Sequence, residues 1–225
     1  MPTPTNEELI DEINTLLGPG IIPPYTFASD AADIFEGYVF GLLVRAARNE
    51  GAATRYVDVS GAETQNLILR SSPGSIWSQR RAFTHAELAF PNKPTLEAHV
   101  GIFVSGRSKV EHECDVDALY EDEANTCRQN QVHPRQSKVL LSVECKFYSS
   151  GLGIDLARSF MGLVTDISTG SRFFVTNTSY ANLEAILSYH NLDWEHDLAP
   201  INTRVAQRLL CHFEGVFRNF KATRQ

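Results

Sequence analysis

The sequence predicts an α/β protein with a mixed central β-sheet flanked by helices. Two observations indicate this fold. Apolar residues recur at helical spacing near both ends of the chain and again after residue 153, whereas most segments between residues 54 and 148 read as strands bounded by Gly, Pro, Ser or Asn. The order of helix, several strands, helix, strand and helix is typical of helices packed on a sheet.

Composition narrows the classes of protein to consider. The chain has 225 residues, 43% of them hydrophobic and 21% charged, which suits a soluble globular domain. No apolar run approaches the roughly 20 residues that span a bilayer, and residues 1–5 lack the basic start of a signal peptide. We therefore expect a cytoplasmic protein with no membrane partner. The net charge of −7 argues against passive coating of nucleic acid, although a metal site also concentrates carboxylates.

The N-terminal segment reads as a helical arm. Residues 5–17 predict a helix whose apolar stripe is formed by Leu9, Ile13, Leu16 and Leu17. A Gly-Pro-Gly sequence ends this helix at residue 18, and two prolines at 23 and 24 force an extended linker. We expect residues 1–24 to be an arm that packs on the body or on another subunit, and residues 25–225 to form one domain.

The remaining elements follow in order along the chain. A helix is predicted from about residue 29, capped by Ser29 or Asp30, to residue 49. Strands are predicted at 54–60, 66–70, 83–90, 96–106, 112–120 and 138–148. The polar stretch 121–137 is a candidate functional loop. Beyond it we expect a helix over 154–167, a strand over 171–177, and helices over 182–190 and after Pro200.

The four cysteines give little support to a zinc or redox module. Cys114, Cys127, Cys145 and Cys211 form no Cys-x-x-Cys pair. Because Cys114 and Cys145 lie in apolar strand-like segments, we expect both to be buried free thiols.

Charged residues occur inside two of the predicted strands. Strand alternation places Glu113, Asp115 and Asp117 on one face of the first strand. In the second strand, Glu144 and Lys146 share a face. If the two strands pair, Asp115, Glu144 and Lys146 gather on one side of the sheet. Buried charges are costly unless they are paired or bind a metal, so these three are the catalytic candidates.

This residue set is suited to metal-dependent phosphodiester hydrolysis. Carboxylate oxygens are the ligands that Mg²⁺ or Mn²⁺ prefers, so Asp115 and Glu144 are the expected metal ligands. A bound ion polarises a phosphate and lowers the pKa of a water molecule. Lys146 can orient that water and stabilise the developing negative charge.

The pattern HECDVDALY…VLLSVECKFY resembles the PD-(D/E)xK phosphodiesterase superfamily, whose fold is restriction-endonuclease-like. The resemblance covers about residues 30–180, implies an αβββαβ core, and leaves the helices of 181–225 outside it. It implies that Asp115 is the first acidic residue of the motif, Glu144 the second and Lys146 the lysine. Cys114 stands where the motif's name has proline, at a position that varies within the superfamily.

Several further residues are weaker candidates. The resemblance implies that Glu36 is the helical carboxylate that approaches the metal, and Glu113 and Asp117 are possible accessory groups beside it. Arg158 either contacts phosphate or pairs with Asp155, and His112 is expected to contact water. The candidate nucleic-acid contacts, besides Arg158, are Arg80 and Arg81 beside Trp77, and Arg135 and Lys138 in the polar stretch.

The leading hypothesis is a Mg²⁺-dependent nuclease, an endonuclease acting on DNA in preference to RNA. The resemblance implies a role in defence, repair or mobile-element biology. The chain has little room for a separate target-recognition domain, so we expect a homodimer, a partner subunit or recognition of structure to supply specificity. The alternative is a catalytically silent subunit with the same fold that binds nucleic acid or a protein.

Overall fold

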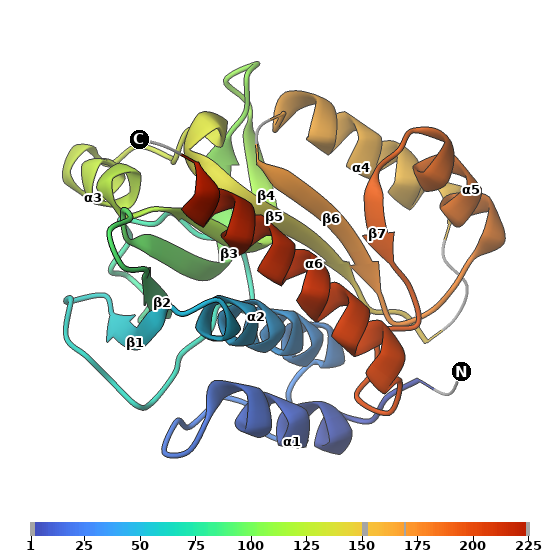
Figure 1. Cartoon of the computed structure of the whole chain (residues 1–225), viewed down its shortest axis with the longest axis horizontal. Coiled ribbons are helices and arrows are strands. Elements are labelled where there is room, and N and C mark those ends of the chain that lie inside the picture. Colours follow the sequence, from blue (N-terminus) through green and yellow to red (C-terminus); the bar gives the residue numbers. More distant parts are fainter. Residues whose placement is uncertain (1–2, 150–152, 169, 224–225) are drawn as a thin grey trace.

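The computed structural model describes residues 3–149, 153–168 and 170–223. Within this part of the chain, one mixed sheet is flanked by six α-helices, so the predicted α/β class is confirmed (Figure 1). The strands are β1 (Ala53–Asp58), β2 (Thr84–Ala89), β3 (Leu96–Ser105), β4 (Glu111–Tyr120), β5 (Val139–Lys146), β6 (Ser171–Thr176) and β7 (Asp193–Glu195). The helices are α1 (Asn6–Leu17), α2 (Ala31–Asn49), α3 (Glu121–Asn130), α4 (Ile154–Asp166), α5 (Ala181–Tyr189) and α6 (Thr203–Ala222).

The seven strands lie side by side in chain order, from β1 to β7. Strands β1 to β5 are antiparallel neighbours, whereas β5, β6 and β7 run parallel to one another. Parallel neighbours require a crossover, and α4 and α5 supply the two that the sequence order demands. β5 therefore lies where the antiparallel and parallel halves of the sheet meet.

The larger core lies between one face of the sheet and α1, α2 and α6. Figure 1 shows α6 crossing this face beside α2, with α1 packed outside them. The N-terminal arm belongs to this core, because its four predicted stripe residues are all buried in it. A capping box between Thr5 and Glu8 begins α1, and the side chain of Asp30 caps α2. On the opposite face, α3, α4 and α5 cover two smaller apolar clusters.

Three elements differ from the sequence prediction. Residues 66–70 form no strand. Isolated hydrogen bonds hold the segment instead, such as the one that the backbone N–H of Ile68 donates to the Thr84 hydroxyl, and the Ile68 side chain is exposed. The predicted loop 121–137 contains α3 and a short 3₁₀ helix, Gln136–Lys138. Two small side chains of α3, Ala124 and Cys127, pack into the apolar cluster, and Glu123 is buried beside them through its pair with Arg135. The short strand β7 was not predicted at all.

Candidate functional site

The candidate site lies where β4 and β5 separate. The hydrogen-bonded register between these strands runs to Val116 opposite Val143 and goes no further. Asp115 is the first residue of β4 beyond that point, and its Oδ2 accepts the backbone N–H of Cys145 at 2.7 Å. A side-chain carboxylate therefore replaces the next backbone partner, which fixes Asp115 in the opening between the strands.

The structure brings the three catalytic candidates together in this opening. The ammonium of Lys146 lies 2.7 Å from Oε1 of Glu144 and 3.3 Å from Oδ2 of Asp115. The Asp115 side chain is 7% exposed, whereas those of Glu144 and Lys146 are 19% and 25% exposed. Two carboxylates thus meet at one partly accessible ammonium, which is an arrangement that solvent and a ligand can reach.

The electrostatics of this cluster favour an additional positive charge. Burial, reinforced by the charge of Asp115, raises the pKa of Glu144 above its ordinary value. Burial and the charges of Asp115 and Asp33 raise the pKa of Glu36 to about 9. Burial alone lowers the pKa of Lys146, but the charges of Asp115 and Glu144 more than offset this and raise it. Lys146 therefore stays protonated between carboxylates that repel one another.

Strict strand alternation predicted that Glu113 and Asp117 lie on the same face of β4, but the two side chains have different environments. Glu113 is exposed, and burial together with the charge of Asp115 raises its pKa. Asp117 is completely buried opposite Ser142; burial raises its pKa well above the ordinary range, and the Ser142 hydroxyl only partly offsets this. Burial of Asp117 thus favours the protonated form of its carboxyl. Glu36, from α2, is half-buried and near enough to Asp115 for their charges to interact.

The apolar alternation of β4 also breaks at Asp115. Val116 belongs to the core under α2, whereas Cys114 belongs to the cluster on the opposite face, although residues two apart in a regular strand share a face. In β3, Gly101 lies between the residues that pair with Val116 and Cys114, and its φ is +62°. This left-handed conformation, which favours glycine, turns the strand and changes which face the following side chains meet. Cys114 and Cys145 are buried free thiols, as expected.

The basic candidates are largely engaged with carboxylates. Arg158 pairs with Asp155 at 3.1 Å on the exposed surface of α4, which is one of the two roles considered for it. In the predicted loop, Arg135 forms a bidentate pair with Glu123. Lys138 lies 3.4 Å from Asp122. These three side chains are therefore not brought to the carboxylate–lysine cluster by any direct contact among the described residues.

Arg80 and Arg81 have a different setting. Both are exposed and line a cavity of about 390 Å³ together with Arg70, which is half-buried. Trp77 packs partly into the core and its ring lies 4.5 Å from that of His133. The loop that carries the two arginines is consequently anchored, while their guanidinium groups remain available to solvent.

His112 does not simply contact water. Its Nε2 lies 2.6 Å from Oδ2 of Asp166, and the Ser108 backbone N–H donates to the other oxygen of that carboxylate at 2.7 Å. The sequence did not predict this partner, because Asp166 is the last residue of α4 and reaches the turn between β3 and β4 only in the folded chain. His112 keeps an exposed fraction of 24%, so a water contact stays a prediction.

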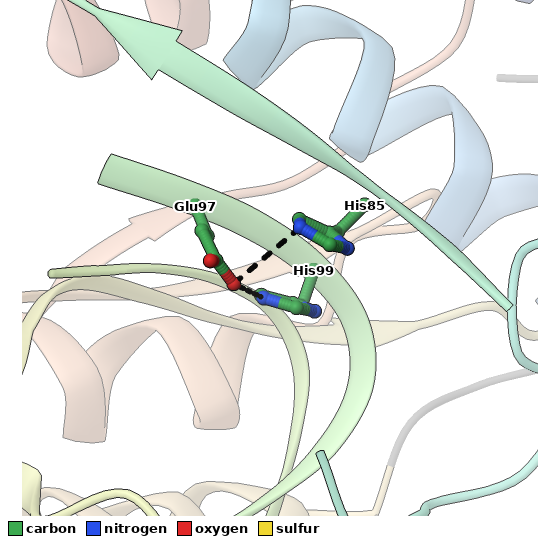
Figure 2. Close-up of side chains that lie close together, drawn as sticks. All are labelled: His85, Glu97 and His99. Atoms are coloured by element: carbon green, nitrogen blue, oxygen red, sulfur yellow. Dashed lines mark hydrogen bonds and ion pairs between the residues drawn. The ribbon is translucent and has the colours of Figure 1, made fainter. Parts of the chain in front are cut away.

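A second cluster was missed by sequence reasoning. His85 of β2 and Glu97 and His99 of β3 are all buried, and Figure 2 shows both imidazoles directed at one carboxylate. Nε2 of His99 lies 2.9 Å from Oε2 of Glu97, and Nε2 of His85 lies 3.6 Å from it. The two rings stack at 15° with centroids 4.8 Å apart. A Glu-x-His pair inside an apolar strand was the available signal, because residues i and i+2 share a face.

This second cluster could hold a metal ion. Among the described residues it is the only group of three or more His, Cys, Asp or Glu whose ligand atoms all lie within 4.8 Å of one another. Asp115 and Glu144 do not form such a group with Glu36 or Glu113. The carboxylate–lysine cluster therefore offers two carboxylate ligands, and substrate phosphate and water would have to complete the coordination shell of a Mg²⁺ ion there.

Charge is distributed unevenly within the second cluster. Burial lowers the pKa of His85 to about 3, helped by the nearby His99, so its imidazole is neutral at pH 7. Burial likewise lowers the pKa of His99. For Glu97, burial raises the pKa, but hydrogen bonds from His99 and Arg128 outweigh it and lower the pKa to about 2. The cluster consists of one carboxylate held by a guanidinium and two neutral imidazoles.

The chain was compared with protein families, curated proteins and solved structures. No protein-family model matches the chain, and neither the curated proteins nor the solved structures yield a match. None of the helices in the described part of the chain is both long and apolar enough to cross a membrane.

Proposed function

We propose that the protein is a metal-dependent nuclease that hydrolyses phosphodiester bonds, with DNA as the favoured substrate. The observation that carries this proposal is the placement of the Lys146 ammonium between the carboxylates of Asp115 and Glu144, at the open end of β4 and β5. A buried ion-pair cluster with a purely structural role would be expected to close on itself, whereas this one is partly exposed.

The donor set fits Mg²⁺ or Mn²⁺. Asp115 and Glu144 would hold the ion through hard oxygen ligands. Bound there, the ion would polarise the scissile phosphate and lower the pKa of a water molecule. Lys146 would donate hydrogen bonds to the attacking water or to a phosphate oxygen on which negative charge develops. The hydrogen bond from Cys145 keeps Asp115 oriented throughout.

The order of elements supports the restriction-endonuclease-like resemblance. Helix α2, strands β3, β4 and β5, helix α4 and strand β6 occur in the order αβββαβ when the insertions are set aside: β1 and β2 lie between α2 and β3, and α3 lies between β4 and β5. Glu36 of α2 is near enough to Asp115 for their charges to interact. β1 and β2 extend the sheet beyond this core. If the substrate is a duplex, a two-fold dimer would present one carboxylate–lysine cluster to each strand.

The test is a cleavage assay on supercoiled DNA, linear DNA and RNA with Mg²⁺, Mn²⁺ or EDTA. We expect metal-dependent cutting by the wild type and a loss of about 100-fold or more in Asp115→Asn and Lys146→Ala, the size seen when a group that stabilises the transition state is removed. Asp155→Asn and Lys109→Ala are matched controls, because both side chains are exposed and lie outside the cluster. Cutting that survives both cluster substitutions would reject the site.

A non-catalytic binding subunit remains the second candidate. It is favoured by the net charge of −7 and by the engagement of Arg128 and Arg135 with Glu97 and Glu123, which removes two cations from phosphate binding. The same preparation distinguishes the two functions. Binding of DNA or RNA that is unchanged in Asp115→Asn, with no cutting of any substrate by the wild type, would support the binding subunit.

A further inference from the structure

The geometry of His85, Glu97 and His99 points to a second metal site, and we propose that it binds a divalent transition metal of the Zn²⁺ class. These ligands lie on β2 and β3, whereas the carboxylate–lysine cluster is formed by β4 and β5. Two imidazoles and one carboxylate suit zinc and its neighbours, while magnesium prefers oxygen ligands. The proposal therefore stands independently of nuclease activity.

The distances within the cluster are compatible with a shared metal ion. Zinc binds nitrogen and oxygen at about 2.0–2.2 Å, so neighbouring donors of a tetrahedral site lie about 3.3 Å apart. The separations from Glu97 Oε2 are 2.9 Å to His99 Nε2 and 3.6 Å to His85 Nε2, on either side of that value. The longer one exceeds hydrogen-bond length. His85 is nevertheless held with its Nε2 toward the same oxygen, as Figure 2 shows.

Arg128 holds the carboxylate ligand in place, and one of its contacts is to Oε2, the oxygen that faces both imidazoles. Its guanidinium donates from both terminal nitrogens to the two oxygens of Glu97, with Nη1 at 2.9 Å from Oε2. Carboxylates that bind a metal ion are commonly held by hydrogen bonds from outer groups of this kind. Arg128 already neutralises the charge of Glu97. Whether a divalent cation can bind therefore depends on the other charged residues near the cluster.

The cavity beside the cluster supplies the missing negative charge. His85 and Glu97 line a space of about 380 Å³, and its other charged residues are Arg55, Asp58, Glu87, Glu121 and Arg128. Four carboxylates therefore face two guanidinium groups, and a dication would balance the excess. Because two of the three ligands face this cavity, the remaining coordination position would be open to water or a small ligand, as in zinc sites that are not purely structural.

The experiment measures metal content and affinity in the full chain. After treatment with EDTA and dialysis, the protein is titrated with Zn²⁺ by calorimetry, and bound metal is counted by atomic spectroscopy. We expect one tightly bound equivalent in the wild type, and its affinity to fall by about 100-fold or more in His85→Asn and His99→Gln, at least as much as loss of a supporting residue costs. His190→Gln, at an exposed position, is the matched control.

Two further measurements separate this site from the first one and from misfolding. Asp115→Asn, which disables the carboxylate–lysine cluster, should keep the Zn²⁺ equivalent even if it abolishes cleavage. In the wild type, Co²⁺ should give the intense visible bands of four-coordinate cobalt, and histidine ring ¹⁵N spectra should show Zn²⁺-induced shifts at two of the seven histidines. The absence of these signals, or affinities in the two histidine variants equal to that of the wild type, would overturn the proposal.

Discussion

One oxygen of Asp115 links the sheet to the candidate site, because it accepts the backbone N–H of Cys145 at 2.7 Å and lies 3.3 Å from the Lys146 ammonium. The carboxylate therefore contacts both the backbone of β5, at Cys145, and the side chain of the candidate catalytic residue Lys146. Removing it disturbs both, but the two effects can be separated by choosing the substitution.

Asp115→Ala is expected to destabilise the protein more than Asp115→Asn. Alanine leaves the buried Cys145 N–H without an acceptor, at a cost of about 1–3 kcal/mol. Asparagine keeps an oxygen in the same place and loses only the charge. Urea unfolding in EDTA measures both free energies of unfolding. If the two variants unfold at the same urea concentration, the hydrogen bond to Cys145 does not contribute in the way described.

The ion pair between Arg128 and Glu97 is predicted to be essential for stability. Glu97 is 1% exposed, so Arg128→Met leaves a buried carboxylate without its cation, which typically costs about 3–5 kcal/mol. Arg55→Met is the control, because Arg55 is 53% exposed in its pair with Glu87 and such pairs contribute about 1 kcal/mol or less. Chemical denaturation of both variants provides the comparison, and equal losses would contradict the prediction.

The contribution of Asp166 to the stability of the folded protein should be lost in acid. Hydrogen bonds from Ser108 and His112 lower the pKa of this carboxyl from 3.8 to about 2. A carboxyl with a depressed pKa stabilises the folded state above its unfolded pKa, and the contribution disappears as the pH falls from 3.8 toward 2. The difference in melting temperature between wild type and Asp166→Asn should therefore shrink across this interval. A difference that is constant with pH would argue against the assignment.

Two helical glycines are predicted to respond oppositely to alanine. At Gly37, in α2, a Cβ atom would lie 2.4 Å from Cε2 and 2.5 Å from the hydroxyl of Tyr25, so Gly37→Ala must displace that ring and destabilise the protein. At Gly162, in α4, a Cβ would meet no atom within 4 Å, so Gly162→Ala should stabilise the protein by about 0.5–1 kcal/mol. Thermal unfolding distinguishes the two; stabilisation at Gly37 would show that Tyr25 moves freely.

Local patterns in the sequence were sufficient to predict every described α-helix except α3, and every described strand except β7. The apolar stripe of α1 depends on neighbours in the chain, and its burial follows directly from that pattern. Strands β2 and β3 are buried on both faces, so local sequence located these strands but did not predict their burial. The same local reasoning selected Asp115, Glu144 and Lys146, because charges inside apolar strands stand out. It failed for α3, where Ala124 and Cys127 are the only apolar side chains buried and the third buried residue is a glutamate. It also failed for residues 66–70, which have partners at Ile22 and Thr84 far away in the chain.

Only the tertiary structure decided how these residues meet. Whether Asp115 and Glu144 converge depends on where β4 and β5 separate, which is a property of strand register and not of either segment alone. His85 joins Glu97 and His99 only because β2 pairs with β3, so a contact across 12 residues was needed to see that cluster. The sequence by itself determined which side chains carry the chemistry; the packing of the sheet determined which of them can act together.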